Sequence, residues 1–425
     1  MSVQVLSGEF LADANTDSLY DLQFNVPGLV VNNVGGFGAR FALRGITDQG
    51  GTGLAVATHV NGVYLGDSQL ALGRLFDLER VEILKGPQGT LYGRNSTGGS
   101  INFITRAPRP DFEAAIESSY GSFATAGVQA SVNVPLGDSA VRIAFAGANG
   151  EGFIRNTVDD RRFAEDDFWG LRGSWRLIVD ERLDVTLTAQ RVVDDGAGGE
   201  LWLPNPAFLP DPSDIHLTTV TLADPFLKTE NDFAGLDAVY DFGTLSLRSV
   251  TGFAHSDSRD RDDCAGLPFL RDCVREILPA KHRQFSQEFQ LTSAGDGEFD
   301  WLVGVNYYDA DDSTRFFQFT PAINPLPTFN YRARSSTSAY AVFGEASLLL
   351  AEHWTVTGGL RYSHEERRVS SVGTGTQDNP VLRTADSDWG RVSWRVNLAY
   401  APSPNTMLYT GISTGFKSGG VTTQR

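Results

Sequence analysis

The chain has 425 residues and a formal net charge of -17, and 41% of its residues are hydrophobic. Its 45 glycines and 27 phenylalanines, set against 2 methionines and 2 cysteines, favour short strands and turns over an ordinary helical enzyme. The negative charge disfavours a nucleic-acid partner. No apolar run reaches the roughly 18 residues of a membrane-spanning helix, which excludes such a helix but not a transmembrane β-barrel, whose strands alternate in polarity.

Residues 1–108 are predicted to form a compact, glycine-rich domain of mixed α/β structure. A helix is expected over residues 7–23, since Val26-Pro27-Gly28 follows it and stops helices. Short strands are expected next, at 29–32, 41–44 and 58–64. Asn61-Gly62 is predicted to be a tight turn inside the last of these. The N-terminus lacks the basic and apolar segments of a secretory signal peptide.

Residues 75–106 are the most informative stretch of the chain. They are predicted to form a strand at 81–84, a turn at Gly86-Pro87, a compact glycine-rich segment, and a second strand at 101–105. Proline presets the backbone for a turn, and glycine permits positive φ angles.

From residue 112 onward, apolar residues recur at every second position, as in strands with one apolar face. Leu183 and Val185, for example, alternate with Asp184 and Thr186. A soluble sandwich would alternate in the same way. The links between strands, however, are short and long in turn, which is typical of an up-and-down antiparallel transmembrane barrel. Aromatic residues beside the short links are expected to form an interfacial girdle: Phe299, Trp301, Trp354 and Tyr400.

Counting these segments predicts about thirteen strands. They lie at roughly 112–120, 125–135, 139–149, 168–179, 183–194, 231–241, 244–256, 283–294, 299–310, 336–350, 353–369, 387–400 and 405–418. Plugged outer-membrane transporters have about 22 strands. Residues 109–425 are therefore expected to be the N-terminal part of a barrel, truncated by about nine strands.

Four motifs in order carry a resemblance to a known family: Val26-Pro-Gly28, Leu43-Arg-Gly-Ile46, Val60-Asn-Gly-Val-Tyr64 and the stretch 75–106. The chain resembles the TonB-dependent outer-membrane receptors, with a plug domain followed by part of the barrel. The resemblance implies import of an external ligand, most often a ferric siderophore. It also implies TonB, outer-membrane lipid and a small-molecule ligand as partners. Nothing before Ser7 resembles the family's TonB box.

The resemblance also implies an ionic lock between plug and barrel. Arg44 and Lys85 match plug cations that face barrel carboxylates in the family, and Glu288 and Glu345 match those carboxylates. Lys85 stands where arginine is commoner, which would remove the bidentate fork and weaken the lock. The alternative is that these charges face a water-filled lumen.

By the same analogy, ligand contacts would come from plug loops near 32–38, 48–53 and 66–70, with Asn33, Gln49, Ser68 and Gln69 as candidates. Cys264 and Cys273 lie close together in one expected external loop, and a disulfide is the favoured reading in an oxidising compartment. No residues form a catalytic motif, and no cofactor or metal site is predicted.

The sequence thus predicts a receptor of the bacterial outer membrane and not an enzyme. Two alternatives stay open: a truncated module that binds or senses ligand without transport, and a soluble β-rich adhesin or enzyme that shares plug-like segments.

Overall fold

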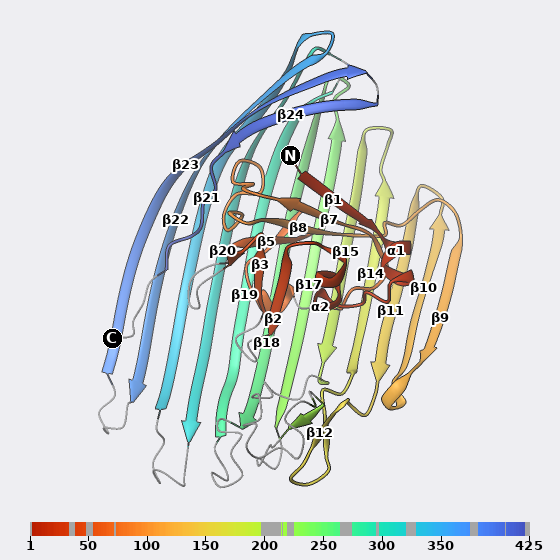
Figure 1. Ribbon diagram of the computed structural model, residues 1–425. Coiled ribbons are helices and arrows are strands. Elements are labelled where there is room, and N and C mark those ends of the chain that lie inside the picture. Colours follow the sequence, from red (N-terminus) through yellow and green to blue (C-terminus); the bar gives the residue numbers. More distant parts are fainter. Residues whose placement is uncertain are drawn as a thin grey trace.

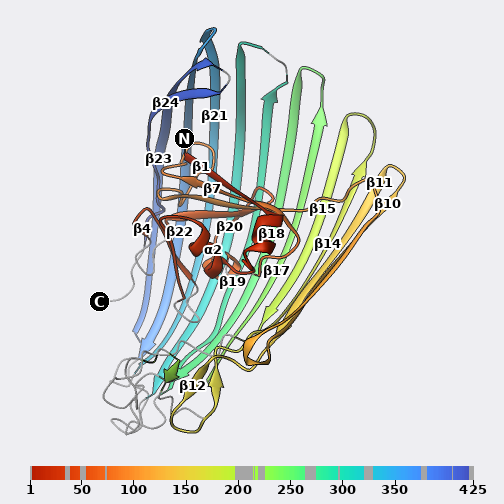
Figure 2. The ribbon, with the colours of Figure 1, turned by 45° about the vertical axis from the view of Figure 1, so that its right-hand side comes forward.

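The computed structural model describes residues 2–33, 39–47, 54–71, 74–196, 214, 216–218, 225–263, 274–294, 297–319, 329–374, 381–403 and 405–420. These residues form a small mixed N-terminal domain and one large antiparallel sheet that curves around it (Figures 1 and 2). None of the described helices is long and apolar enough to cross a membrane.

The expectation of one helix over residues 7–23 is wrong, because two short helices occupy this region. They are α1 (Gly8–Asp13) and α2 (Leu19–Asn25). Asn15 has a φ of 47°, a left-handed conformation that ends α1. Ser18 then caps α2 in a reciprocal capping box with Asp21, which satisfies backbone donors at the new helix start.

The N-terminal domain is built on a five-stranded sheet in the order β1-β7-β8-β5-β6. Its strands are β1 (Ser2–Ser7), β5 (Val56–Val60), β6 (Val63–Leu65), β7 (Leu78–Lys85) and β8 (Gly99–Thr105). A smaller sheet contains β2 (Leu29–Asn33), β3 (Ala39–Leu43) and β4 (Ile46–Thr47), and a short helix, α3 (Ser68–Ala71), follows β6. Asn61 and Gly62 both have positive φ angles in the β5–β6 turn, which agrees with the tight turn expected there.

A single apolar core holds this domain together. Leu19 and Leu22 of α2 are fully buried in the same cluster as Val81, Ile83 and Ile101 of the sheet. Residues 75–106 therefore contain the β7–β8 pair at the centre of the domain, and this pair packs against α2.

The described residues place thirteen strands in the large sheet, each antiparallel to its neighbours. In chain order they are β9 (Glu113–Tyr120), β10 (Ala126–Leu136), β11 (Ser139–Asn149), β14 (Asp167–Ile178), β15 (Leu183–Asp194), β17 (Phe226–Asp241), β18 (Leu245–Asp263), β19 (Val274–Ser293), β20 (Phe299–Phe319), β21 (Phe329–Ala351), β22 (Trp354–Thr374), β23 (Val381–Ser403) and β24 (Thr406–Ser413). The predicted up-and-down arrangement is confirmed, and among the described residues the edge strands β9 and β24 do not pair with each other.

Several strands are longer than the sequence suggested, at the end that carries the long links. β20, for example, extends to Phe319 and β19 begins at Val274. The extra residues do not alternate between apolar and polar, so the sequence pattern does not reveal them, yet their backbones continue the ladder with their neighbours. In the long links, β12 (Ile154–Asn156), β13 (Arg162–Phe163) and β16 (Leu217–Thr218) add a small sheet.

The large sheet carries its apolar side chains outward and its polar side chains inward. On β11, Ile143 and Phe145 are exposed, whereas Arg142 points toward the N-terminal domain and is only 3% exposed. On β14, Trp175 is exposed while Arg172 and Ser174 are buried. This pattern is the reverse of a water-soluble protein, and it fits a wall with hydrocarbon outside and a polar lumen inside. It disagrees with the alternative of a soluble adhesin or enzyme.

One glycine of the β7–β8 pair tests how tightly the N-terminal domain is packed. Gly99 has a φ of 148°, and a Cβ atom there would lie 2.2 Å from the carbonyl oxygen of Leu84. We expect Gly99→Ala to destabilise the domain by about 2 kcal/mol or more, measured as the urea midpoint for protease cleavage of detergent-solubilised protein.

Gly121→Ala is the matched control for this substitution. A Cβ atom at Gly121 would meet no other atom within 4 Å, so the midpoint should stay unchanged. Equal midpoints for the two variants would contradict the close packing at Gly99.

Candidate functional site

The interface between the N-terminal domain and the inner face of the large sheet contains a buried ion pair. Arg142 of β11 donates from Nη2 and Nε to the two carboxylate oxygens of Asp77, over 2.5 and 2.8 Å. The two side chains are only 3% and 9% exposed. Two parallel bonds to one carboxylate fix both direction and distance, so this pair orients the domain against the wall.

A second ion pair joins the glycine-rich segment between β7 and β8 to β22. Arg94 Nη2 lies 3.0 Å from the carboxylate of Glu365, whose side chain is 1% exposed. Ser418, near the C-terminal end of the described chain, donates to the other oxygen of Glu365 over 2.7 Å. Burial disfavours the charged guanidinium, but the Glu365 carboxylate together with Tyr64, Tyr308 and Asp312 outweighs burial, so the pKa of Arg94 lies above its ordinary value.

A third contact involves Arg74, which lies between α3 and β7. Its Nε is 2.9 Å from Asp194 at the end of β15, and its Nη2 is 2.6 Å from Asp166. The guanidinium also stacks over the ring of Phe168, 4.1 Å from its centroid. Three arginines in different parts of the interface therefore connect the domain to the wall.

Neutral hydrogen bonds hold the segment from Tyr64 to Gln69 against the wall. Gln284 of β19 donates to the Tyr64 carbonyl over 2.6 Å and accepts from the Gly66 amide over 2.8 Å. Gln69 donates to Ser258 of β18 over 3.2 Å. A Cβ atom at position 66 would overlap the Tyr308 hydroxyl, so glycine is required for this close approach.

A cavity of about 570 Å³ lies between the domain and the wall. Its lining includes His59, Tyr64, Tyr92 and Arg94 from the domain, and Glu288 from the sheet. The lining combines aromatic faces with charged groups, the chemistry of a polar passage rather than of a sealed core.

Comparison with known proteins identifies the two parts of the chain. Residues 1–100 match the family described as TonB-dependent Receptor Plug Domain, and residues 169–424 match TonB dependent receptor-like, beta-barrel. The chain belongs to the TonB-dependent receptor family. The N-terminal domain is the plug and the large sheet is barrel wall, and the expected absence of enzyme activity agrees with this family of receptors and transporters.

The chain is similar to named receptors over most of its length. It is 24% identical to the pesticin receptor of Yersinia enterocolitica, over 99% of this chain and 61% of that protein. It is 31% identical to the catecholate siderophore receptor Fiu of Escherichia coli strain UTI89, over 96% of this chain and 60% of that protein. The crystal structure of the ferric yersiniabactin uptake receptor FyuA from Yersinia pestis has the same fold, with a TM-score of 0.87 at 20% identity, covering 98% of this chain and 64% of that one.

Three of the four residues predicted to form an ionic lock, Lys85, Glu288 and Glu345, have other partners. Lys85 donates to Gln4 and to the Pro27 carbonyl, over 3.0 and 3.1 Å. Glu345 of β21 forms a bidentate pair with Arg395 of β23. In the part of the chain that the structure describes, neither Arg44 nor Lys85 forms an ion pair with Glu288 or Glu345.

The physical reason is competition inside the barrel wall. The Arg395 fork occupies both oxygens of Glu345, and Glu288 accepts hydrogen bonds from Gln290 and Asn306 instead. Arg44 and Lys85 face Arg395 across a cavity of about 390 Å³. The lock between these four residues stays a prediction. The ion pairs that do join plug and barrel could have been found from Arg142, an arginine on the inward face of an alternating strand.

The predicted ligand-contact residues lie in different surroundings. Asn33 ends β2, and Gln49 lies outside the described residues. Ser68 and Gln69 are in α3, only 9% and 3% exposed, so they are packed against the wall rather than open to a ligand. Cys264 and Cys273 also lie outside the described residues, so the disulfide stays a prediction. Within the described ranges, no group of three or more His, Cys, Asp or Glu residues is placed to hold a metal ion.

The Arg142–Asp77 pair is expected to stabilise plug seating. Asp77→Asn should lower the stability of the seated plug by about 2 kcal/mol, because the buried guanidinium loses its bidentate charged partner and keeps only the Glu113 carboxylate, 3.3 Å away. Asp77→Asn with Arg142→Gln should cost less than the sum of the two single changes. The measurement is the urea midpoint at which a protease releases the plug from the solubilised protein.

Asp232→Asn is the control for the Asp77 and Arg142 substitutions. Asp232 pairs with Arg191 on the exposed outer face, at 3.1 Å, where such pairs contribute about 0.5 kcal/mol or less. A loss as small for Asp77→Asn as for Asp232→Asn would show that the buried pair does not hold the plug.

His59 should make plug stability depend on pH. It is buried, with its Nδ1 3.3 Å from Ser100 Oγ and its ring against Tyr64 and Tyr92. Burial, and then the nearby Arg361 guanidinium, lower the pKa of His59 to about 3. As pH falls below about 6.5, the unfolded chain takes up a proton that the folded plug does not, so stability should fall by about 1.4 kcal/mol per pH unit.

His59→Gln should remove the part of the pH dependence of plug stability that comes from this proton uptake, measured as plug release between about pH 7.5 and about pH 5. His353→Gln, an exposed histidine in the β21–β22 turn, should leave the slope unchanged. An unaltered slope in His59→Gln would contradict the role of this histidine.

Proposed function

We propose that this chain is part of an outer-membrane receptor that imports a scarce ligand, with the plug gating the barrel lumen and TonB supplying the mechanical work. The proposal covers the whole receptor, because the chain spans 61% of the length of the pesticin receptor it matches. Membership of the TonB-dependent receptor family supports it.

The observation that carries the proposal is how the plug is attached. It sits on the inner, polar face of a sheet whose outer face is apolar, and charged pairs such as Arg142–Asp77 and Arg94–Glu365 join it to the wall. Breaking such a pair by removing one partner is costly. Separating both partners into a wet lumen costs little, because water solvates each charge again. Attachment of this kind holds the plug at rest and lets it yield to a pull.

The cargo that fits best is a ferric siderophore. Similar proteins include a catecholate siderophore receptor and a ferric yersiniabactin uptake receptor. These two receptors share the class of cargo, an iron chelate, so we propose that class for this protein and do not specify the chelating group.

A disulfide that ties plug to barrel tests the gating. A Cβ atom at Gly89 of the plug would lie 3.3 Å from the Cβ of Ser393 on β23, close to the spacing of bridged cysteines. In the full-length receptor, Gly89→Cys with Ser393→Cys should block uptake of ⁵⁵Fe-loaded catecholate siderophore or ⁵⁵Fe-yersiniabactin when oxidised. Reduction should restore uptake, because it frees the plug.

Ser174→Cys with Thr188→Cys is the matched control, since these residues face each other on neighbouring wall strands with their hydroxyl oxygens 3.1 Å apart. A bridge within the wall should leave uptake unchanged. Full uptake through a receptor with the plug bridge closed would refute gating by the plug. Binding of both iron chelates without any uptake in the unbridged receptor would favour a module that only binds or senses.

A further inference from the structure

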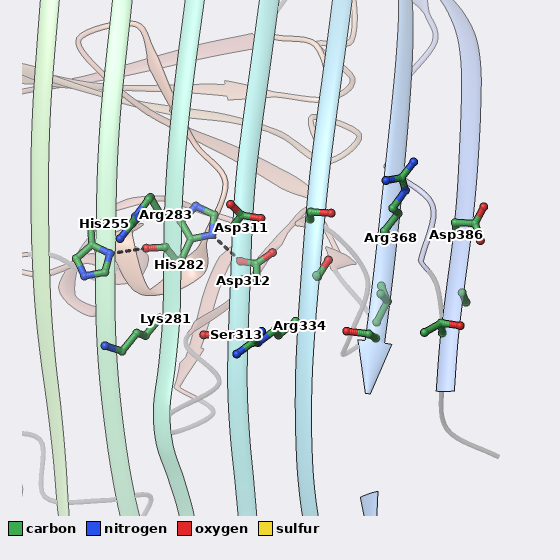
Figure 3. A pocket seen from close by; sticks show the side chains of 16 residues that line it. His255, Lys281, His282, Arg283, Asp311, Asp312, Ser313, Arg334, Arg368 and Asp386 are labelled. Carbon is green, nitrogen blue, oxygen red and sulfur yellow. Dashed lines mark hydrogen bonds and ion pairs between the residues drawn. The ribbon is translucent and has the colours of Figure 1, made fainter. Parts of the chain in front are cut away.

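The outer face of strands β18 to β23 changes from apolar to charged toward the long-link end. A groove of about 690 Å³ lies in the charged part. Figure 3 shows it with the plug behind the strands, so the groove opens away from the lumen. Its labelled cations are Lys281, Arg283, Arg334 and Arg368, besides two histidines.

Strand register arranges the outer face in rows. One apolar row crosses five strands through exposed side chains: Phe289, Val305, Val342, Tyr362 and Val392. In the next row Tyr307 lies opposite Tyr340, both exposed, as in an aromatic girdle at a membrane surface. These rows mark where hydrocarbon contact ends.

Beyond the girdle the rows are charged. One row reads His255, Arg283, Asp311, Ser336, Arg368 and Asp386, and the next reads Asp257, Lys281, Ser313, Arg334, Ser370 and Thr384. Lys281 is 3.1 Å from Asp257 and so is neutralised. In the described part of the chain, Arg283, Arg334 and Arg368 form no ion pair.

The next row outward, beyond Ser313 and Arg334, places two like charges face to face. Arg315 of β20 is directly opposite Arg332 of β21, both exposed, and neither has an ion pair within the described ranges. Like charges directly opposite across a strand pair repel each other. A second groove, of about 460 Å³, is lined by this pair and by Arg334. An anion between these arginines would convert repulsion into charge-assisted hydrogen bonds.

We propose that these two outer-face grooves bind a phosphorylated glycolipid of the leaflet around the barrel. This inference rests on the proposed function, because it requires the barrel wall to be embedded in a membrane. The acyl chains would lie along the apolar rows, and the phosphates would meet Arg283, Arg332, Arg334 and Arg368. Arg315 would share the phosphate that binds Arg332.

Spacing along the strand favours a glycolipid over a simple phospholipid. The unpaired arginines begin four residues beyond the Tyr307–Tyr340 row and reach eight residues beyond it. At about 3.3 Å per residue, that is about 13 to 26 Å along the strand, farther than a phosphate attached directly to glycerol extends. Phosphates carried on a sugar head group reach that height.

The test uses full-length receptor purified from outer membranes in mild detergent and analysed by native mass spectrometry. The probes are rough lipopolysaccharide, the same material with its phosphates removed, and phosphatidylglycerol. The wild-type receptor should retain the phosphorylated glycolipid at least about tenfold more strongly than either other probe, since several cations meet its phosphates. Excess inorganic phosphate should not displace it, because the acyl chains add to binding.

Arg332→Gln with Arg334→Gln and Arg368→Gln should lower that retention by about tenfold or more. Arg191→Gln is the matched control, because Arg191 is also an exposed arginine but pairs with Glu230 and Asp232, and its retention should equal wild type.

Equal retention of phosphorylated and dephosphorylated glycolipid by the wild-type receptor would overturn the inference, and this comparison needs no variant. Preference for phosphatidylglycerol, or displacement by inorganic phosphate alone, would also overturn it. None of these results would touch the proposed function, which depends on gated uptake. Recovery of the receptor without detergent would instead refute membrane embedding and with it the proposed function.

Discussion

Each strand of the large sheet must satisfy two surroundings at once, and the rest of the structure depends on this constraint. Side chains alternate across the sheet, so a strand that lies against the plug places half of its residues on the outer face and half toward the plug. Inward arginines such as Arg142 and Arg172 are therefore removed from water when the plug is seated, and each needs an acceptor there. Arg142 finds the Asp77 carboxylate, and Arg172 donates to the Phe76 carbonyl over 2.9 Å. The acceptors that these wall arginines require therefore determine where the plug sits.

Attachment through charges has a different character from attachment through an apolar core. An apolar interface would have to expose hydrocarbon to water when the plug moved, and that cost grows with the area exposed. A charged interface exchanges one set of hydrogen bonds for another. The plug keeps its own apolar core, centred on Leu22 and Val81. Its contacts with the wall combine ion pairs and hydrogen bonds with two small apolar clusters, one around Val63 and Leu65 and one around Phe76. It can shift as a unit without being dismantled.

Alternation and turn chemistry made much of the fold predictable. The strand at 183–194 and the Asn61-Gly62 turn follow from local patterns, and both are present. The single helix over 7–23 was wrong because amphipathic spacing does not reveal the break at Asn15, after which the Ser18–Asp21 capping box starts a second helix. The full length of β20 was missed because residues 311–315 are polar and interrupt the apolar alternation, while ladder pairing continues through them to Gln318. In the candidate site, charge partners depend on register between distant strands, so Arg395 rather than a plug cation occupies Glu345.

The Glu365 carboxylate joins three remote parts of the chain, and this has a consequence for how the protein reaches its final state. Arg94 is 271 positions before Glu365, and 324 positions separate Arg94 from Ser418. Contacts of such long sequence separation form late, because the chain between them must be ordered first. The β7–β8 segment leaves the ribosome and crosses into its compartment long before β22 does. The Arg94 guanidinium of that segment therefore stays in water until Glu365 is present. The plug core can form early, and docking of the plug on the wall is among the last steps of assembly.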